Sequence, residues 1–300
     1  MVEAHVAALL EPAPSAPPLD EARAFCLRLA RSHYENFTVL SWLSPRSMRE
    51  PLACLYAYCR TVDDLGDEAP GDRLALLDRY ESELDAAFDG RPAHPVLVAL
   101  RPIIAQYRLP REPFAKLIEA NRIDQQKRRY ATFEEVIRYC DHSANPVGRL
   151  FLMLYGYRDD ERFALSDATC TALQLANHWQ DLRRDAEIGR IYLPQDEMAA
   201  YDVTEDDLGA DRATDDLRRL MRFQVERTRD WFARGLPLID RVRGHLKVDL
   251  ALFSRGGLAI LNAIEHQGFD TLSRRPTVGN AKKLALFAST LVSRRWRRWV

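Results

Sequence analysis

Apolar residues recur at helical spacing along almost the whole chain from Leu19 onward. In residues 46–67 they return every three or four positions, which places them on one face of an α-helix. That stripe consists of Leu52, Leu55, Tyr56, Cys59 and Val62. No stretch alternates apolar and polar residues over a useful length, and no segment repeats another. The pattern therefore predicts an all-α protein.

The helix boundaries follow from capping residues, glycines and prolines. We expect helices over residues 20–33, 46–67, 72–88, 95–107, 112–128, 132–155, 166–185 and 211–235, with two more beginning at 248 and 277. Thr132, with Glu135 three positions on, fits a capping box. Residues 1–18 read as a disordered lead-in, since 11–18 hold four prolines. Residues 19–300 show no shift in composition, which favours one helical domain.

Composition excludes several classes of function. The chain has 300 residues, of which 47% are hydrophobic, enough to bury a large core. Lys plus Arg is 43 and Asp plus Glu is 44, so the net charge of −1 lacks the basic excess of a nucleic-acid-binding protein. The five cysteines include no Cys-x-x-Cys pair, which favours reduced thiols in a cytoplasmic protein.

The two ends of the chain bear on its location. Residues 1–10 contain Glu3 but no Lys or Arg, so the charged start of a signal peptide is missing. No stretch reaches the ~20 uninterrupted apolar residues of a membrane span. The tail 293–300 combines four arginines with two tryptophans, a composition that suits a membrane interface. We expect a cytoplasmic protein with peripheral contact to the inner membrane face; the alternative is a solvated helix end.

Five aspartates in two clusters carry the candidate chemistry: Asp63, Asp64, Asp67, Asp181 and Asp185. Asp63 to Asp67 and Asp181 to Asp185 are four-residue steps, which stack two carboxylates on one helix face. Like charges there repel, so two such pairs facing each other across a helical bundle need a cation. Magnesium fits, because it accepts a few carboxylates and completes its shell with water and phosphate oxygens. The alternative is that both clusters are solvated helix faces.

Longer motifs surround these aspartates, and from about Phe25 to Lys283 the chain resembles the squalene/phytoene synthase family, which joins prenyl diphosphates head to head. The resemblance rests on Tyr56-Ala57-Tyr58-Cys59-Arg60-x-x-Asp63-Asp64-x-x-Asp67, on Gln174-x-x-Asn177-x-x-x-Asp181-x-x-x-Asp185, on Gly189-Arg190-Ile191-Tyr192-Leu193-Pro194, and on Tyr139-Cys140 with Ser143-Ala144-Asn145-Pro146-Val147-Gly148. It implies a single helical bundle of the isoprenoid-synthase type with a central cavity.

A narrower resemblance is to the bacterial hydroxysqualene synthase branch, the HpnC type. It is carried by His33-Tyr34-Glu35-Asn36-Phe37, by Asn177-x-Trp179-Gln180-Asp181 and by the Ser-Ala-Asn-Pro block. Most family members have Arg where this chain has Gln180, so one cationic partner of the diphosphate is missing. Many members also have Tyr where this chain has Leu258, and no site role is carried over there.

The resemblance implies the following site. All five aspartates are catalytic; Asp63, Asp67, Asn177, Asp181 and Asp185 bind Mg²⁺; and the substrate contacts His33, Tyr56, Arg60, Tyr139, Gln174 and Asn177. The substrate is presqualene diphosphate, whose ionisation releases diphosphate and leaves a carbocation that water quenches, giving hydroxysqualene for squalene and hopanoid biosynthesis. No NADPH is expected. Tyr56, Tyr139, Phe37 and Trp179 are candidates for lining an apolar channel, with core packing as the alternative for each.

Three alternatives stay open. The chain could instead make presqualene diphosphate, squalene or phytoene from two prenyl diphosphates. It could be a head-to-tail prenyltransferase, although the Tyr-x-x-Cys-Arg and Asn-Pro-x-Gly blocks argue against that. It could be a non-catalytic assembly protein, although all five aspartates are present. Expected partners are the lipid substrate and product and sister enzymes of the squalene pathway, with no nucleic acid.

Overall fold

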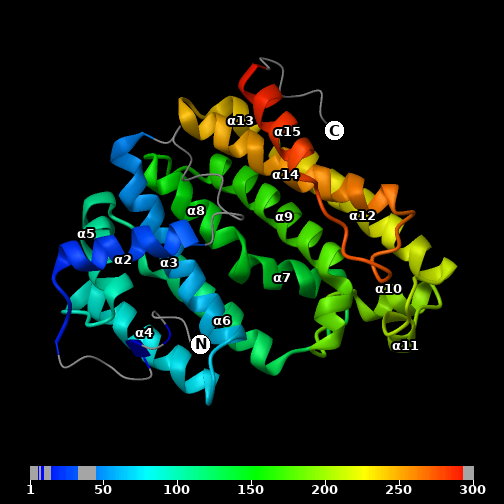
Figure 1. Ribbon diagram of the computed structural model, residues 1–300, viewed down its shortest axis with the longest axis horizontal. Helices are drawn as coiled ribbons and strands as arrows, with labels where there is room; N and C mark the ends of the chain where they lie inside the picture. The colour runs from blue at the N-terminus through cyan, green and yellow to red at the C-terminus, as the bar shows by residue number, and fades with distance from the viewer. Residues whose placement is uncertain (1–5, 7, 10–14, 33–44, 293–300) are drawn as a thin grey trace. The chain divides into compact units, whose positions relative to one another are not determined.

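A computed structural model describes residues 6, 8, 9, 15–32 and 45–292 of the chain (Figure 1). It contains two compact units. Unit 1 comprises Met1–Gln126 with Arg149–Arg158, and unit 2 comprises Lys127–Gly148 with Asp159–Val300. The described residues are helical with loops and turns, and their only β-type pairing is one isolated bridge between Arg129 and Ile191. The predicted all-α class is confirmed.

Unit 1 is built around helix α3. Its helices are α2 (Leu19–Ser32), α3 (Arg46–Asp67), α4 (Arg73–Asp89), α5 (Pro95–Tyr107) and α6 (Arg111–Gln126), and α8 (Asn145–Leu154) ends in it. Helix α3 packs against α2, α4, α5 and α6. It is apolar on more than one face, as a surrounded helix must be: Leu52, Tyr58 and Leu65 are all almost completely buried.

Local signals set the helix ends in unit 1. The Asp72 carboxylate accepts a hydrogen bond from the Ala75 amide at 3.1 Å and so caps α4, one residue later than the expected start at 72. Pro95 begins α5, where a missing N–H costs nothing. Helix α5 ends at Arg108, whose φ of 48° is left-handed. The predicted bounds 46–67 and 95–107 are confirmed.

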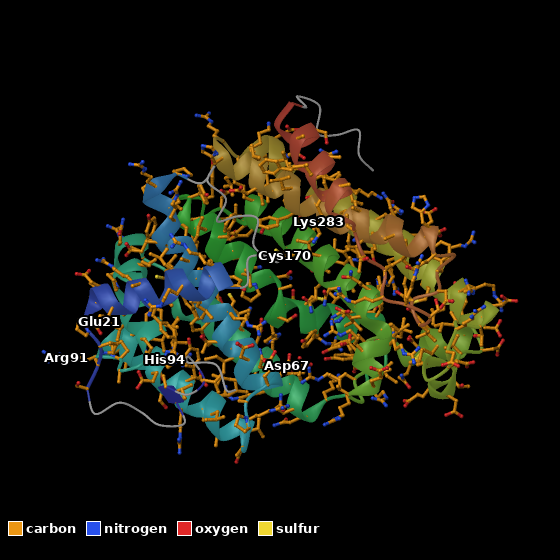
Figure 2. The ribbon with its side chains drawn as sticks, viewed as in Figure 1. Glu21, Asp67, Arg91, His94, Cys170 and Lys283 are labelled. Carbon is orange, nitrogen blue, oxygen red and sulfur yellow. The ribbon has the colours of Figure 1, made fainter. Side chains whose placement is uncertain are left out.

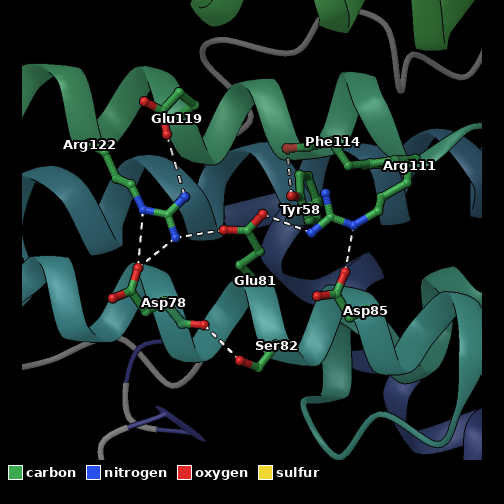
Figure 3. A network of polar contacts seen from close by, with 9 residues as sticks. All are labelled: Tyr58, Asp78, Glu81, Ser82, Asp85, Arg111, Phe114, Glu119 and Arg122. Carbon is green, nitrogen blue, oxygen red and sulfur yellow. Dashed lines mark hydrogen bonds and ion pairs between the residues drawn. The ribbon is translucent and has the colours of Figure 1, made fainter.

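Ion pairs connect α4 to α6, as Figure 3 shows. Glu81 on α4 lies between two arginines of α6, with its carboxylate oxygens 2.8 Å from Arg111 Nη2 and 2.6 Å from Arg122 Nη2. Arg111 also contacts Asp85, and Arg122 contacts Asp78. Burial alone would raise the pKa of Glu81, but hydrogen bonds from Arg111 and Arg122 outweigh it and lower the pKa. This network fixes α6 against α4.

Unit 2 is built around the long helix α9. Its helices are α7 (Phe133–Ser143), α9 (Asp160–Glu187), α10 (Gln195–Ala200), α11 (Glu205–Leu208), α12 (Asp215–Gly235), α13 (Leu238–Arg241), α14 (His245–His266) and α15 (Asn280–Val292). Helix α9 packs against α7, α11, α12, α13 and α14. The Trp179 side chain is fully buried, and its indole N–H donates to Thr228 Oγ1 on α12 at 2.8 Å.

Two expectations about residues 132–155 are wrong. The segment is two helices, α7 and α8, with the break at Ala144. Pro146 explains the break, because proline donates no hydrogen bond and restricts the residue before it. Thr132 forms no side-chain cap, so the capping box is absent. The Glu135 carboxylate instead accepts from the Ala131 amide at 2.8 Å and from Lys127 Nζ at 2.9 Å.

Further observations concern the cysteines, the segments at the edges of the described residues and the search for membrane-spanning helices. All five cysteines are free. Of the expected lead-in 1–18, the structure describes 6, 8, 9 and 15–18, and Val6 and Leu9 are buried. The segment between the helices expected at 20–33 and 46–67 lies almost wholly outside the described residues, and the tail 293–300 lies entirely outside them. Within the described part of the chain, no helix is long and apolar enough to cross a membrane.

Candidate active site

The first acidic motif lies in the last turns of α3. Asp63 and Asp67 are one turn apart and both side chains are exposed (Figure 2 labels Asp67). The C-terminal end of a helix carries partial negative charge, and this end has no basic residue in its last turn. Two carboxylates at this end repel each other and are also repelled by the negative end of the helix dipole. The predicted stacking is present, and its electrostatics favour a bound cation.

Asp64 points the other way, into the protein. Its side chain is only 3% exposed and forms a two-point ion pair with Arg60, with Nε to Oδ2 at 2.9 Å and Nη2 to Oδ1 at 2.6 Å. Arg60 Nη2 also contacts Glu68 at 3.3 Å. A paired arginine keeps its planar fork in a fixed orientation. The structure therefore gives Asp64 a contact that orients Arg60, while the catalytic role of Asp64 and the substrate contact of Arg60 stay predictions.

The carboxyl group of Asp63 has a raised pKa. Its side chain is reached by solvent, yet the surrounding protein still desolvates the carboxyl, and together with the Asp67 charge this raises its pKa to about 7. A hydrogen bond from Asn121 on α6 acts in the opposite direction. Asn121 is buried, and its Nδ2 donates to the Leu117 carbonyl at 3.2 Å. A carboxyl group that ionises so reluctantly would gain from a nearby divalent cation.

Asp63→Asn is expected to flatten the pH dependence of stability measured in EDTA. Because the folded pKa of about 7 lies above the ordinary value of 3.8, the Asp63 proton stabilises the fold at low pH, and that contribution disappears as pH rises towards and through 7. Thermal midpoints at pH 5 and pH 8 should therefore fall further for the wild type than for Asp63→Asn. Parallel pH profiles for the two proteins would contradict the expectation.

The neighbouring Gly66 sets how closely α3 approaches α6. A Cβ atom at position 66 would overlap the side chain of Asn121. Gln125 Nε2 donates to the Gly66 carbonyl at 2.9 Å, which fixes the same contact from the other side. Because Gly66 has no side chain, α6 can pack close enough to α3 for Asn121 to lie against the acidic motif. The sequence alone does not single out Asn121, because an asparagine inside a helix gives no local signal of its partner.

The second acidic motif lies on α9 in unit 2. Gln174, Asn177, Asp181 and Asp185 follow one another at steps of three or four residues along this helix, so they share one face as predicted. Asn177 is exposed, and Gln174 and Asp185 are partly buried. Gln174 Nε2 lies 3.4 Å from His178 Nε2. The metal-binding role of Asn177 and the substrate contacts of Gln174 and Asn177 stay predictions.

Asp181 has a partner that was not expected from the sequence. Its side chain is 12% exposed, and the guanidinium of Arg275 engages both carboxylate oxygens, with Nη2 to Oδ2 at 3.0 Å and Nε to Oδ1 in close contact. Arg275 lies in the loop between α14 and α15. The preceding residue, Gln180, is buried, and its Nε2 donates to the Pro276 carbonyl at 2.6 Å. Arg275 is 94 positions from Asp181, so no local pattern could have shown the pair.

The aromatic candidates are mostly packed. Tyr139 in unit 2 is buried in a cluster with Tyr130, Tyr192 and His178, in which the His178 and Tyr192 rings stack with centroids 3.8 Å apart. Burial lowers the pKa of His178 to about 3, so this imidazole is neutral at physiological pH. Tyr56 in unit 1 belongs to a buried cluster with Ala30 and Ala53. Core packing accounts for these contacts, and for Trp179, without a ligand.

The Ser-Ala-Asn-Pro-x-Gly block connects α7 and α8 to α9. Asn145 Nδ2 donates to Asp141 at 2.7 Å, and Asn145 Oδ1 accepts from Thr171 Oγ1 at 3.1 Å. Gly148 lies so close to α9 that a Cβ atom there would overlap Ser166 and Cys170. Figure 2 labels Cys170 on α9. This motif is explained by packing within unit 2.

The donor sets suit magnesium if phosphate oxygens complete the shell. Among the described residues, no group of three or more His, Cys, Asp or Glu side chains could hold a metal ion alone. Each acidic motif supplies carboxylates at one-turn spacing, and magnesium commonly takes one or two carboxylates with water and substrate phosphates. The residues present therefore fit metal ions that arrive with a diphosphate. His33 and Phe37 lie outside the described residues.

Comparison with solved structures first defines the class. A dehydrosqualene synthase matches with a TM-score of 0.84 at 21% identity, covering 91% of this chain and 96% of that one, which establishes the fold. The protein has the all-α isoprenoid synthase fold. The squalene synthase HpnC from Alicyclobacillus acidocaldarius matches with a TM-score of 0.80 at 50% identity, covering 84% of this chain and 95% of that one.

Sequence comparisons then define the family. The squalene/phytoene synthase model matches residues 6–282. A 15-cis-phytoene synthase of Synechococcus elongatus is 32% identical over 284 residues, covering 89% of this chain and 91% of the relative. A phytoene synthase of Arthrospira platensis is 31% identical over 282 residues, covering 86% and 89%. The chain belongs to the squalene/phytoene synthase family, as its motifs predicted, and the members of this family are prenyl-diphosphate-using synthases.

Proposed function

We propose that this protein is a hydroxysqualene synthase, converting presqualene diphosphate and water to hydroxysqualene and diphosphate. The observation that carries the proposal is the 50% identity to the squalene synthase HpnC, against 32% to a phytoene synthase. The Asn177-x-Trp179-Gln180-Asp181 form of the second motif supports it from the sequence. The product would supply squalene and hopanoid biosynthesis.

The acidic motifs account for the ionisation step. Bound magnesium would neutralise charge on the departing diphosphate. Asp63 and Asp67 on α3 would hold magnesium at the first motif, and Asn177, Asp181 and Asp185 on α9 would hold it at the second. Arg60, oriented by Asp64, has the fork geometry for bidentate phosphate contacts. His33, Tyr56, Tyr139 and Gln174 are the other proposed substrate contacts.

The second half of the reaction is the fate of the cation. The cation left by ionisation first rearranges, with breakage of a C–C bond of the cyclopropane ring. Water then adds to one carbon of the rearranged cation and loses a proton, which yields the alcohol without change of oxidation state and without NADPH. The rest of the hydrocarbon must stay dry, because stray water would give other alcohols. Tyr139 is the proposed aromatic contact for this step, because an aromatic face stabilises a nearby cation.

A second candidate is the condensation of two prenyl diphosphates to presqualene diphosphate or phytoene. The specific observation in its favour is the match to 15-cis-phytoene synthase over 89% of the chain. That reaction also uses two acidic motifs, so the motifs alone do not separate the two. The missing arginine at Gln180 favours the hydroxysqualene reaction.

The deciding experiment is product analysis in ¹⁸O-water. The full chain is incubated with magnesium and either presqualene diphosphate or farnesyl diphosphate, without reductant, and the lipids are analysed by mass. We expect hydroxysqualene from presqualene diphosphate, carrying ¹⁸O from the solvent. Unlabelled hydroxysqualene would rule out the water quench.

Three other outcomes would assign the protein a different role. Squalene that appears only when NADPH is added would indicate the reductive reaction. Consumption of farnesyl diphosphate, with presqualene diphosphate left intact, would indicate the first condensation step. No turnover of any prenyl diphosphate would favour the non-catalytic assembly role.

The proposed substrate also suggests where in the cell the protein works. Both substrate and product are long lipids, so we propose a cytoplasmic protein that touches the inner membrane face through residues 293–300 and exchanges lipids with sister enzymes of the squalene pathway. Vesicle co-sedimentation of the full chain and of a variant lacking 293–300 tests the membrane contact.

A further inference from the structure

At the second acidic motif, Gln180 bonds to the loop residue that follows Arg275, and Arg275 itself pairs with Asp181. Arg275 engages both oxygens of Asp181, and Arg184 Nη1 approaches Oδ1 at 3.7 Å. The Asp181 carboxylate is nearly buried, whereas the Arg275 side chain is 40% exposed. Hydrogen bonding to Asp181 raises the pKa of Arg275, so this guanidinium stays charged at any working pH. Both oxygens of this carboxylate therefore already have a cationic partner.

A divalent cation at Asp181 competes with Arg275 for the same carboxylate oxygens. Magnesium binds a carboxylate oxygen at about 2.0–2.1 Å, and Arg275 already uses one lone pair on each oxygen and places a positive charge beside the other. The guanidinium therefore weakens metal binding until it moves away from Asp181. A phosphate anion removes this conflict, because it offers the displaced guanidinium another bidentate partner.

Gln180 holds the backbone that presents Arg275. Its Nε2 donates to the carbonyl of Pro276, the next residue along the loop. Gln180 is on the buried side of α9, so this hydrogen bond is shielded from water and costs free energy to leave unmade. Arg183, three positions on, donates to the Leu272 carbonyl of the same loop at 2.9 Å, which fixes its other end.

We propose that Gln180 is a positioning residue that keeps Arg275 on Asp181, so that Asp181 accepts a metal ion readily only when a diphosphate takes over the guanidinium. The inference rests on the proposed function in that Asp181 is taken as a metal ligand. It explains the neutral residue at position 180, because the loop after α14 brings a cation, Arg275, to both oxygens of Asp181. Metal loading is thereby coupled to substrate arrival.

The test measures Mn²⁺ binding to the purified full-length protein without diphosphate, by the electron paramagnetic resonance signal of free Mn²⁺. Arg275→Gln should tighten Mn²⁺ binding roughly 5-fold or more, the lower range of typical site–site coupling. Gln180→Leu changes no charge. It should also tighten Mn²⁺ binding, because the loop that carries Arg275 is then held less firmly against α9. The double variant should bind Mn²⁺ no more tightly than Arg275→Gln alone, because Gln180 acts through Arg275.

Two control variants distinguish the proposed role of Arg275 from a general effect of positive charge and from misfolding. Arg274→Gln removes the same charge one position away, from a side chain that contacts Gln267 instead of Asp181, and should leave Mn²⁺ affinity unchanged. Asp181→Asn should weaken Mn²⁺ binding in every background. Thermal melts of each variant report whether the fold is retained, and inorganic pyrophosphate added to the wild type should tighten Mn²⁺ binding.

The outcomes are distinct from those of the product assay. Unchanged or weaker Mn²⁺ binding in folded Arg275→Gln overturns the proposal, as does an additive effect of Gln180→Leu in the double variant. An equal gain in Arg274→Gln overturns it too, since it would show a general charge effect. If the expected Mn²⁺ pattern is found but presqualene diphosphate is not turned over, the coupling stands and only the hydroxysqualene assignment fails.

Discussion

Asp63→Asn or Asp181→Asn is expected to lower turnover roughly 10²-fold or more, the size of effect seen when one group that stabilises transition-state charge is removed. Each substitution keeps the shape of the side chain and removes one negative charge from a motif that would hold magnesium against the diphosphate. Excess EDTA should abolish turnover of the wild type for the same reason. The measurement is the initial rate of diphosphate release at saturating substrate.

Loss of activity has to be separated from loss of structure. Asp206→Asn is a matched control, since Asp206 is an exposed aspartate on the short helix α11 and belongs to neither motif. It should retain full activity. Circular dichroism should show the same helix content in all three variants. Near-wild-type rates in Asp63→Asn or Asp181→Asn, or full activity in excess EDTA, would show that the two motifs are merely solvated helix faces.

Prediction from the sequence worked best where all the residues of a pattern lie on one helix. The apolar stripe of residues 46–67 predicted α3 with its observed bounds, because a surrounded helix needs buried residues at every turn. The four-residue steps of the aspartates followed directly, since helix geometry alone places Asp63 beside Asp67 and Asp181 beside Asp185. Family motifs supplied the expected chemistry, and the family itself is confirmed.

The contacts that the sequence did not predict depend on how distant parts of the chain pack together. Arg275 lies in a loop far along the chain from Asp181, and its partner is fixed by how that loop folds back on α9. Asn121 acts on Asp63 only because α6 packs on α3 at Gly66. The break at Ala144 had a local cause in Pro146, and the apolar pattern on both sides of that proline hid it.

Gly66→Ala is expected to lower both stability and activity. In a helix interior, alanine is favoured over glycine by about 0.5–1 kcal/mol. Here the new Cβ would overlap Asn121, and overpacking of this kind costs about 1–3 kcal/mol, so the steric term prevails. Moving Asn121 also disturbs its hydrogen bond to Asp63, so the rate should fall along with the thermal midpoint.

Two further variants test whether the effect of Gly66→Ala comes from the overlap with Asn121. Gly256 lies inside α14 with open space where a Cβ would go, so Gly256→Ala should keep or raise the thermal midpoint by helix propensity alone. Adding Asn121→Ala to Gly66→Ala removes the amide that the new methyl group meets and should restore part of the lost stability. It should not restore the rate, because the hydrogen bond to Asp63 is then absent. A Gly66→Ala protein as stable and active as the wild type would mean that α6 can move away from α3 at little cost, and that Asn121 does not position the carboxylate of Asp63.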